Sequence, residues 1–502
     1  MALIAATAGA CALSAGSDAT HPAGASSTRL GAARAAPCSH FGRPALALDP
    51  RPHALRVFAI QLMQRPGQMR DGAAYRAAID CALRHEVLPH LARGRANLVV
   101  FDEDAGLQAL GVGPRGAAAR GLLRRGVSGC PGFPCATLAI LSALNHGYAA
   151  ALHYLQARFP PLRTELGMSF VAATDTFVRV FMATMAAEAR RYGIYIVASN
   201  TQAPFALTRD PAAVAALRDP ATPGVRAVYA PTAARAYDQV LLWGPRVVHD
   251  DVPAPLANLI AVNRKTPLTS FETVLGFAPG PSGGAAAIAN LRPVTIPGTG
   301  ARLGFATSLP AFVYGPQVPA QRACADVTVS YMRCLDHLGA NVLIQADAND
   351  GAWTGTDGSD KAESWQPMSW MGSAWRAVSD PSVHFAYAVN PMLVGNLADT
   401  PFDGQSAILQ RGRRGAGCHY IGNARFIPRR DDPALRSFAG PKPQFLALAP
   451  WAVPDAPRPQ LAAVGQALAS GRGTHAYVQT ALIADLPFPL DRVRPGCRVA
   501  GR

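Results

Sequence analysis

The sequence predicts an α/β fold in which two β-sheets pack face to face and helices cover both outer sides, a four-layer αββα sandwich with long insertions. Two observations lead to this prediction. Short apolar runs typical of buried strands alternate with segments of helical spacing. Antiparallel hairpins are expected inside this alternation, so the order of elements fits two layered sheets better than one parallel sheet.

The first expected unit is strand, helix, strand. The run Arg56–Gln61 is a short β-rich stretch, and residues 73–93 carry apolar side chains at helical spacing. A second buried strand follows at Asn97–Phe101 and ends at the acidic residues 102–104. Such a unit belongs to a sheet that is buried between two layers.

The middle of the chain predicts a helix over residues 181–192 and a strand over 193–198. Before them lies an unusually long interval, 105–180, with a Gly/Arg-rich loop and helical segments. After them comes a Pro- and Ala-rich surface insertion at 201–236. A hairpin then starts at Val240, and its return strand runs to about Val262.

The later part predicts a second strand, helix, strand unit. Leu303–Thr307 is a strand, Tyr331–Leu338 is a helix that ends at Gly339, and Asn341–Gln345 is the next strand. No internal repeat is visible in the sequence.

Composition narrows the class of protein. The chain has 502 residues, of which 49% are hydrophobic and 16% charged, enough apolar material for a large core. The formal net charge is +15, but 44 of the 47 basic residues are Arg, scattered without a run longer than two. This pattern argues against a nucleic-acid partner. No apolar stretch of about 18 residues predicts a membrane-spanning helix.

Cysteines and the N-terminus bear on the compartment. Nine cysteines in a chain of this length are ordinary usage, although Cys130 and Cys135 are close enough to form a local disulfide. Residues 1–53 are Ala-rich and read as a disordered extension. We expect a cytoplasmic protein, with export through a diverged N-terminal signal as the alternative.

The sequence predicts neither a metal nor a cofactor. The twelve His residues do not show the spacing of metal ligands, and no Gly-rich phosphate-binding loop follows a strand.

Two motifs at strand ends carry candidate chemistry. The run Leu98–Glu103 delivers Glu103 at the end of an apolar strand, where desolvation favours a general base. The run Val262–Leu268 places Lys265, one of three lysines in the chain, where a fixed positive charge would stabilise an oxyanion. Glu272 follows seven residues later. These motifs resemble the nitrilase superfamily of carbon–nitrogen hydrolases, which has an αββα sandwich and a Glu-Lys-Cys triad.

The resemblance leaves the nucleophile open. In the nitrilase strand motif the cysteine position reads Ser308, and the following aspartate position reads Pro310. Sixteen residues beyond Ser308, Cys324-Ala-Asp326 reproduces a Cys-x-Asp pattern before the expected helix. A thiol ionises far more readily than a hydroxyl. Three alternatives remain: Cys324 is the nucleophile, Ser308 is, or the site has lost covalent chemistry.

Downstream segments extend the resemblance to about residue 430. The runs Leu338–Asn349, 365–390 and Phe402–Ile408 are similar to the family's later strands. Asn349 and Trp353 follow a strand end on the side of the triad and are candidates for substrate binding. The expected organisation is therefore a nitrilase-like domain at 54–430, between the N-terminal extension 1–53 and a C-terminal extension at 431–502.

The resemblance implies a hydrolase of non-peptide C–N bonds in a small amide or nitrile, acting through a covalent acyl-enzyme. Glu103 would be the base, Lys265 the oxyanion-stabilising group and Glu272 a supporting acid. It also implies a homo-oligomer. Two rival functions are a non-catalytic binding or scaffold protein with the same fold, and an acyltransferase of the same superfamily.

Overall fold

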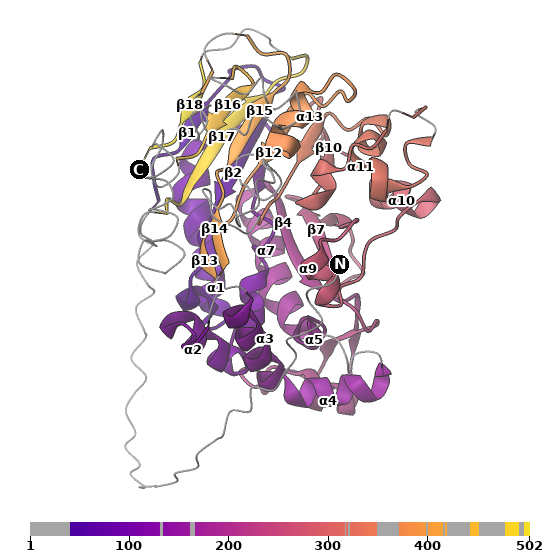
Figure 1. Cartoon of the computed structure of the whole chain (residues 1–502). Helices are drawn as coiled ribbons and strands as arrows, with labels where there is room; N and C mark the ends of the chain where they lie inside the picture. The colour runs from indigo at the N-terminus through magenta and orange to yellow at the C-terminus, as the bar shows by residue number, and fades with distance from the viewer. Residues whose placement is uncertain are drawn as a thin grey trace. The chain divides into compact units, whose positions relative to one another are not determined.

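The computed structural model describes most of the chain beyond residue 40 (Figure 1). The described ranges are 41–130, 134–160, 166–316, 318–319, 322–348, 371–397, 400–414, 417–418, 442–450, 477–490 and 496–501. Within them two seven-stranded sheets form the centre of the molecule, which is the predicted α/β sandwich.

The first sheet has the order β1-β17-β2-β3-β4-β7-β8. Its strands β2, β3 and β4 run parallel, and β7 and β8 follow antiparallel. On the other side of β2 lie β17, antiparallel, and β1, parallel to β17. The strand bounds are β1 Ala45–Ala47, β2 Leu55–Gln61, β3 Asn97–Val100, β4 Tyr195–Gln202, β7 Tyr237–Trp243, β8 Leu259–Arg264 and β17 Thr480–Leu486.

The second sheet has the order β18-β16-β15-β12-β11-β10-β9. Here β10, β11 and β12 run parallel, and β15 and β16 follow antiparallel. Each sheet thus contains three parallel strands followed by two antiparallel ones, a repeat of topology that the sequence does not reveal. The strand bounds are β9 Val294–Thr295, β10 Arg302–Phe305, β11 Val342–Ile344, β12 Tyr387–Asn390, β15 Ala407–Gln410, β16 Phe445–Leu448 and β18 Arg498–Val499.

Both sheets extend beyond the expected domain limits. β17 pairs with all seven residues of β2 and so joins the first sheet near its middle. β16 pairs with β15 in the second sheet, and β1, before residue 54, pairs with β17. The boundaries at 54 and 430 are therefore wrong for the sheets. The segments before 54 and after 430 supply strands, because β2 and β15 would otherwise expose unpaired backbone edges.

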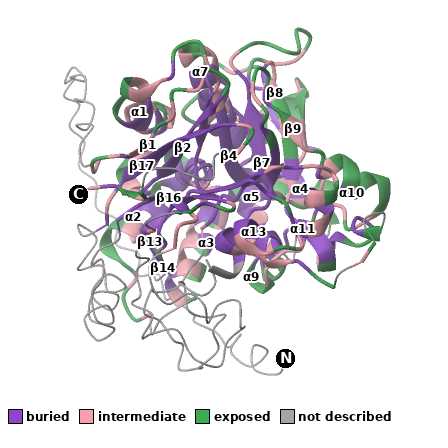
Figure 2. Ribbon diagram, turned by 90° about the horizontal axis from the view of Figure 1, so that it is seen from above, coloured by how far each residue is buried: buried purple, intermediate pink, exposed green. Residues whose placement is uncertain are grey.

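The strands are buried on both faces, as their continuous apolar runs predict. On β2, Val57 and Ala59 join a cluster between the sheets, whereas Phe58 and Ile60 face the helices. The alternation follows from the two-residue period of a strand. Figure 2 shows the central strands β2, β4 and β7 buried and the peripheral helix α10 (Gly284–Asn290) largely exposed.

Two helix layers complete the sandwich. Helices α1 (Gly72–Ala82) and α7 (Ala183–Tyr192) share a cluster with the outer face of the first sheet. Helices α11 (Val327–His337) and α13 (Arg376–Ser379) share one with the second. Helix α11 begins four residues earlier than predicted.

The early start of α11 has a local cause. The side chain of Asp326 accepts a hydrogen bond from the Thr328 N–H (2.9 Å), which caps the helix. The helix ends as expected at Gly339, whose φ of +83° suits glycine.

The two long intervals form additional elements. The described residues of 105–180 contain five α-helices, and α2, α3, α4 and α5 lie below the sheets in Figure 1. Their bounds are α2 Ala117–Arg125, α3 Cys135–Gly147, α4 Ala149–Arg158, α5 Met168–Ala172 and α6 Thr174–Thr176. The interval 201–236 contributes β5 (Phe205–Thr208), α8 (Pro211–Leu217) and β6 (Val228–Pro231). Two further elements, α9 (Ser270–Val274) and the β13–β14 hairpin (Val394–Leu397, Thr400–Asp403), lie near the site described below.

Membrane-spanning length is not reached by any single helix among the described residues. The pair α3 and α4, bent by 80° at their junction, meets the length and composition test only when counted together.

A buried acid beneath the first sheet makes stability depend on pH. Glu86 lies in a π-helical turn (Leu83–Val87), and its carboxylate accepts a hydrogen bond from the Ala481 N–H on β17 (2.9 Å). Burial, opposed by this hydrogen bond, raises the pKa of Glu86 from 4.5 to about 7. The folded state therefore keeps a proton that the unfolded state releases between these pH values.

We expect Glu86→Gln to remove this pH dependence. In the wild type, the contribution of Glu86 to stability is complete below about pH 4 and falls by about 3 kcal/mol as the pH rises to 7. The Tm of Glu86→Gln relative to the wild type should rise steadily between pH 4.5 and 7.5 in thermal unfolding. A constant Tm difference across this range would contradict the assignment.

Candidate active site

Lys265 lies at the centre of a cluster of buried carboxylates. It directly follows β8, and its ammonium Nζ is 2.6 Å from Glu103, 2.9 Å from Glu272 and 3.2 Å from Asp238. Only 3% of Lys265 is exposed. A lone buried ammonium would be costly, and so would three buried carboxylates without a cation. The four groups therefore hold one another in place.

Glu103 connects this cluster to the second sheet. It follows β3 of the first sheet, and one carboxylate oxygen accepts from Lys265. The other oxygen accepts from the backbone N–H of Ala348 at 2.8 Å. Ala348 follows β11 of the second sheet, so Glu103 spans the ends of both sheets.

Glu272 and Asp238 support Lys265 from two further elements. Glu272 lies in the first turn of α9 and forms a capping box with Thr269. Asp238 lies on β7, and its carbonyl accepts from the Lys265 N–H at 2.9 Å. The capping box orients Glu272 locally, whereas Asp238 is placed by its position on β7.

Ser308 enters the same site from the end of β10. It is the one non-glycine residue at positive φ (+53°) among the described residues, a conformation that costs about 1–3 kcal/mol. Its backbone N–H donates to the Asp347 carboxylate at 2.9 Å. Asp347 also accepts from Gln345 (2.7 Å) and Asn390 (2.8 Å), so this strained turn is held from the adjacent strands.

Burial sets the protonation of these groups. For Lys265, burial opposes the charge, but Glu103, Glu272 and Asp238 outweigh it and raise its pKa well above the usual value. Burial, reinforced by Glu103 and Glu272, raises the pKa of Asp238 well above its usual range. For Glu272, burial is outweighed by Lys265, and its pKa is lowered. The shifts therefore favour the ammonium form of Lys265 and disfavour the ionised form of Asp238.

Burial also raises the pKa values of three neighbouring acids. Burial and then Glu103 raise the pKa of Asp104 and that of Asp347, each to about 7. Asp102, fully buried beside them, also has its pKa raised well above the usual value, by burial and then by Asp104. Acids with such shifted pKa values gather at functional sites.

A metal could in principle bind three of these carboxylates. The nearest oxygens of Glu103, Asp238 and Glu272 lie within 4.8 Å of one another. The Lys265 ammonium contacts all three and supplies the positive charge that a metal would bring. The absence of a metal cofactor stays a prediction.

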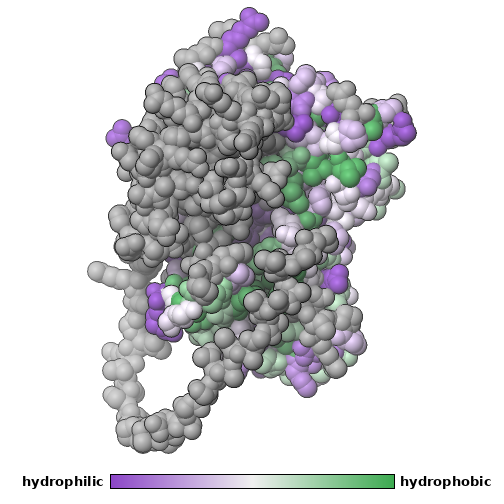
Figure 3. Space-filling model, in the orientation of Figure 1, coloured by the Kyte–Doolittle hydropathy of each residue, from purple (hydrophilic) through white to green (hydrophobic). Residues whose placement is uncertain are grey.

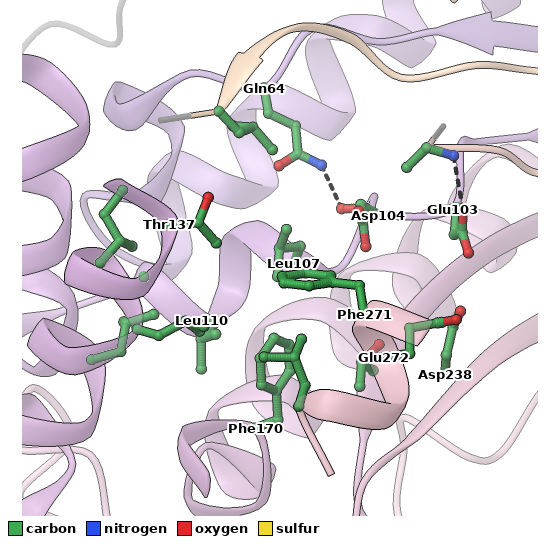
Figure 4. Close-up of a pocket in the computed structure, with 18 of the residues that line it drawn as sticks. Gln64, Glu103, Asp104, Leu107, Leu110, Thr137, Phe170, Asp238, Phe271 and Glu272 are labelled. Carbon is green, nitrogen blue, oxygen red and sulfur yellow. Dashed lines mark hydrogen bonds between the residues drawn. The ribbon is translucent and has the colours of Figure 1, made fainter. Parts of the chain in front are cut away.

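A cavity of about 510 Å³ opens onto the cluster. Glu103, Lys265 and Ser308 line it together with Glu272 and the Ala348 backbone. Figure 4 shows Glu103 and Asp238 at one end of the cavity and Leu110 and Thr137 toward the other. The volume falls within the range of about 300–1,000 Å³ that is usual for small-molecule sites.

Cys324 does not reach this cavity. Its sulfur forms a disulfide with Cys334 on α11, and both residues belong to the core between α11 and the second sheet. The expectation that Cys324 supplies a free nucleophilic thiol is therefore contradicted. Its Cys-x-Asp pattern has a local explanation, because Asp326 is the capping residue of α11.

Comparison with known proteins gives matches among solved structures alone. No protein-family model and no curated protein matches the chain. A carbon–nitrogen hydrolase from Helicobacter pylori is 12% identical, with 72% of this chain and 83% of that chain covered and a TM-score of 0.37. An amidase from Nesterenkonia sp., with the acetamide moiety of fluoroacetamide on its active-site cysteine, is 13% identical, with 72% and 84% covered and a TM-score of 0.36. Likeness at this level establishes no activity.

The strand order and the site geometry decide the fold. Two sheets with outer helices bring Glu103, Lys265 and Ser308, each next to a strand end, to one cavity. The chain has the layered two-sheet α/β sandwich fold that the sequence predicts. The catalytic roles of these residues stay a prediction, because a fold accommodates many chemistries.

Two polar residues of this site were missed at the sequence level. Asp238 lies near the start of the apolar strand β7. The sequence feature that could have identified it is an acidic residue just before the apolar run Val240–Trp243. Asp347 was part of the run Leu338–Asn349 but was not singled out. Two expected substrate-binding residues, Asn349 and Trp353, lie outside the described residues.

Removing the central cation should destabilise the protein in a pH-dependent way. We expect Lys265→Met to lower the free energy of unfolding by about 3–5 kcal/mol at pH 8, because buried carboxylates lose their partner. The loss should shrink at pH 5, where the carboxylates can take up protons. Urea unfolding at both pH values measures this.

The matched control is Lys442→Met, since Lys442 is half-buried and lies outside the carboxylate cluster. It should change the free energy of unfolding by no more than about 1 kcal/mol at either pH. Equal losses for the two variants would show that Lys265 does not compensate the cluster.

Proposed function

We propose that this protein hydrolyses a non-peptide C–N bond of an amide, with Ser308 as the nucleophile. One observation carries the proposal: Ser308, held at positive φ at a strand end, lines the same cavity as Glu103 and Lys265. The disulfide of Cys324 removes the competing nucleophile.

The reaction would proceed in two steps. The Ser308 hydroxyl attacks the amide carbon, and its proton passes through Glu103 to the nitrogen as the C–N bond breaks. An amine leaves, and an ester links the acyl group to Ser308. Water, deprotonated by Glu103, then attacks the ester, releasing a carboxylic acid and returning the proton to Ser308.

Lys265 would stabilise the charge that develops on the carbonyl oxygen. Because its pKa is raised, it stays an ammonium and does not serve as a base. Asp238 and Glu272 also contact Nζ and so act as positioning residues. A cation fixed in this way needs no reorganisation as the oxyanion forms.

A second candidate is a non-catalytic protein with a nitrilase-type fold. A serine hydroxyl is much harder to ionise than a thiol, and Pro310 replaces the aspartate of the family pattern. The acyltransferase alternative differs from hydrolysis only in the acceptor of the second step, an amine instead of water. Amide specificity over nitrile and assembly into a homo-oligomer also stay predictions.

Acylation of Ser308 separates the first two functions. With p-nitrophenyl butyrate we expect a burst of p-nitrophenolate and a butyryl adduct on the peptide that contains Ser308, found by mass spectrometry after acid quench. Ser308→Ala should lose the adduct, and its kcat for amides should fall on the order of 10³-fold or more.

Ser282→Ala is the control for this experiment, because Ser282 is an exposed serine that does not line the cavity. Its burst and kcat should match the wild type. A burst that persists in Ser308→Ala, or a wild type without any adduct, would overturn the proposed nucleophile.

The disulfides favour an oxidising compartment. Besides Cys324–Cys334, the described residues contain Cys130–Cys135 and Cys418–Cys497, and Cys81 is also disulfide-bonded. Disulfides persist mainly in exported proteins. We therefore propose the exported alternative over the cytoplasmic location.

Disulfide mapping tests this proposal. Digestion of the unreduced protein should yield linked peptides for Cys324–Cys334 and Cys418–Cys497. Iodoacetamide under native conditions should label neither Cys324 nor Cys334 until a reductant is added. Rapid labelling of Cys324 in protein purified from its natural compartment would instead restore the thiol as a candidate nucleophile.

A further inference from the structure

The cavity at the Glu103–Lys265 cluster has two chemically different ends. Its carboxylates and the Lys265 ammonium gather at one end. Away from them the wall is mostly aliphatic and aromatic, with Thr137 and Arg120 as polar members (Figure 4). We propose that the substrate is an amide with an extended neutral apolar acyl chain, such as an n-alkanoyl group, which lies along this wall.

The apolar wall comes from the long interval 105–180. A 3-10 helix over Leu107–Gly111 supplies two leucines, α3 supplies three aliphatic residues, and α5 supplies a phenylalanine. These wall residues are Leu107, Leu110, Ile140, Leu141, Leu144 and Phe170. In Figure 3, hydrophobic surface also gathers where Figure 1 places α2 and α3.

The charges of the cavity argue for a neutral chain. Among the described residues, the cations in its lining are Lys265 and Arg120, and Arg120 Nη1 donates to the backbone carbonyls of Gly111 and Gly113. Arg120 thereby holds the turn that carries Leu110. The described lining also contains four acids, Glu103, Asp104, Asp238 and Glu272, at the polar end. This excess of acids over cations disfavours an anionic chain.

The order of bond breaking indicates that the apolar chain belongs to the acyl group of the substrate and not to its amine. This inference rests on the proposed function. The amine leaves first and becomes a cation at neutral pH, which suits the acidic end of the cavity. The acyl group remains bound to Ser308 until water arrives, which suits an enclosed apolar wall. Burial of each methylene should strengthen binding about fourfold, which corresponds to about 0.8 kcal/mol.

The test measures binding separately from turnover. Titration calorimetry with Ser308→Ala would follow the Kd of butanamide, hexanamide and octanamide. We expect the Kd to fall about fourfold per methylene across this series. A Kd that does not change with chain length would overturn the proposal.

A cavity-filling variant locates the chain. Ile140→Trp, made in the Ser308→Ala background, should weaken octanamide binding at least tenfold and leave butanamide binding nearly unchanged. Leu138→Trp is the matched control, because Leu138 lies on the same helix but is 40% exposed and does not line the cavity. If Ile140→Trp lowers the Tm strongly, Leu123→Trp on α2 replaces it, since Leu123 also lines the cavity. Equal effects on both amides would place the chain elsewhere.

The two proposals can fail independently. A chain-length dependence of Kd without any wild-type turnover would support the apolar subsite and reject the hydrolase. Turnover of butanamide and octanamide with the same kcat/KM would support the hydrolase and reject the subsite.

Discussion

The ion cluster around Lys265 is the interaction on which the site depends. One ammonium contacts carboxylates that come from β7, from α9 and from the segment after β3. None of these groups would be stable in the interior alone, because a buried charge needs a partner and hydrogen bonds. The same constraint explains the raised pKa of Asp238, since burial and the neighbouring carboxylates Glu103 and Glu272 disfavour its ionised form.

The topology explains how residues distant in sequence meet. Each sheet has three parallel strands at its centre, and parallel strands end at the same edge. Glu103 follows a parallel strand of the first sheet, while Ser308 and Asp347 follow parallel strands of the second. The Glu103–Ala348 hydrogen bond then joins the two edges directly. The long interval 105–180 adds the apolar wall of the cavity. The sheets therefore position the polar groups, and the insertion shapes the rest of the cavity.

Much of this could be predicted from local pattern. The strands β2, β3 and β10 were predicted to within two residues, because fully buried strands are continuous apolar runs. Glu103 and Lys265 stood out because each follows such a run. The extent of the fold was not predictable, since β17 joins β2 across more than 400 residues of sequence, and pairing partners leave no local signal.

The sequence by itself determined the fold class and the acid–lysine pair, because both depend on short runs of residues. Tertiary structure alone decided which candidate side chains meet in the cavity. The pattern at Cys324 matched the expected motif, but spatial proximity pairs its sulfur with Cys334, and its neighbour Asp326 caps a helix. Ser308 is a serine where the motif has a cysteine. Its backbone conformation and its hydrogen bond to Asp347 nevertheless hold it at the cavity. A residue's neighbours across strands, and not its motif, decide whether it can react.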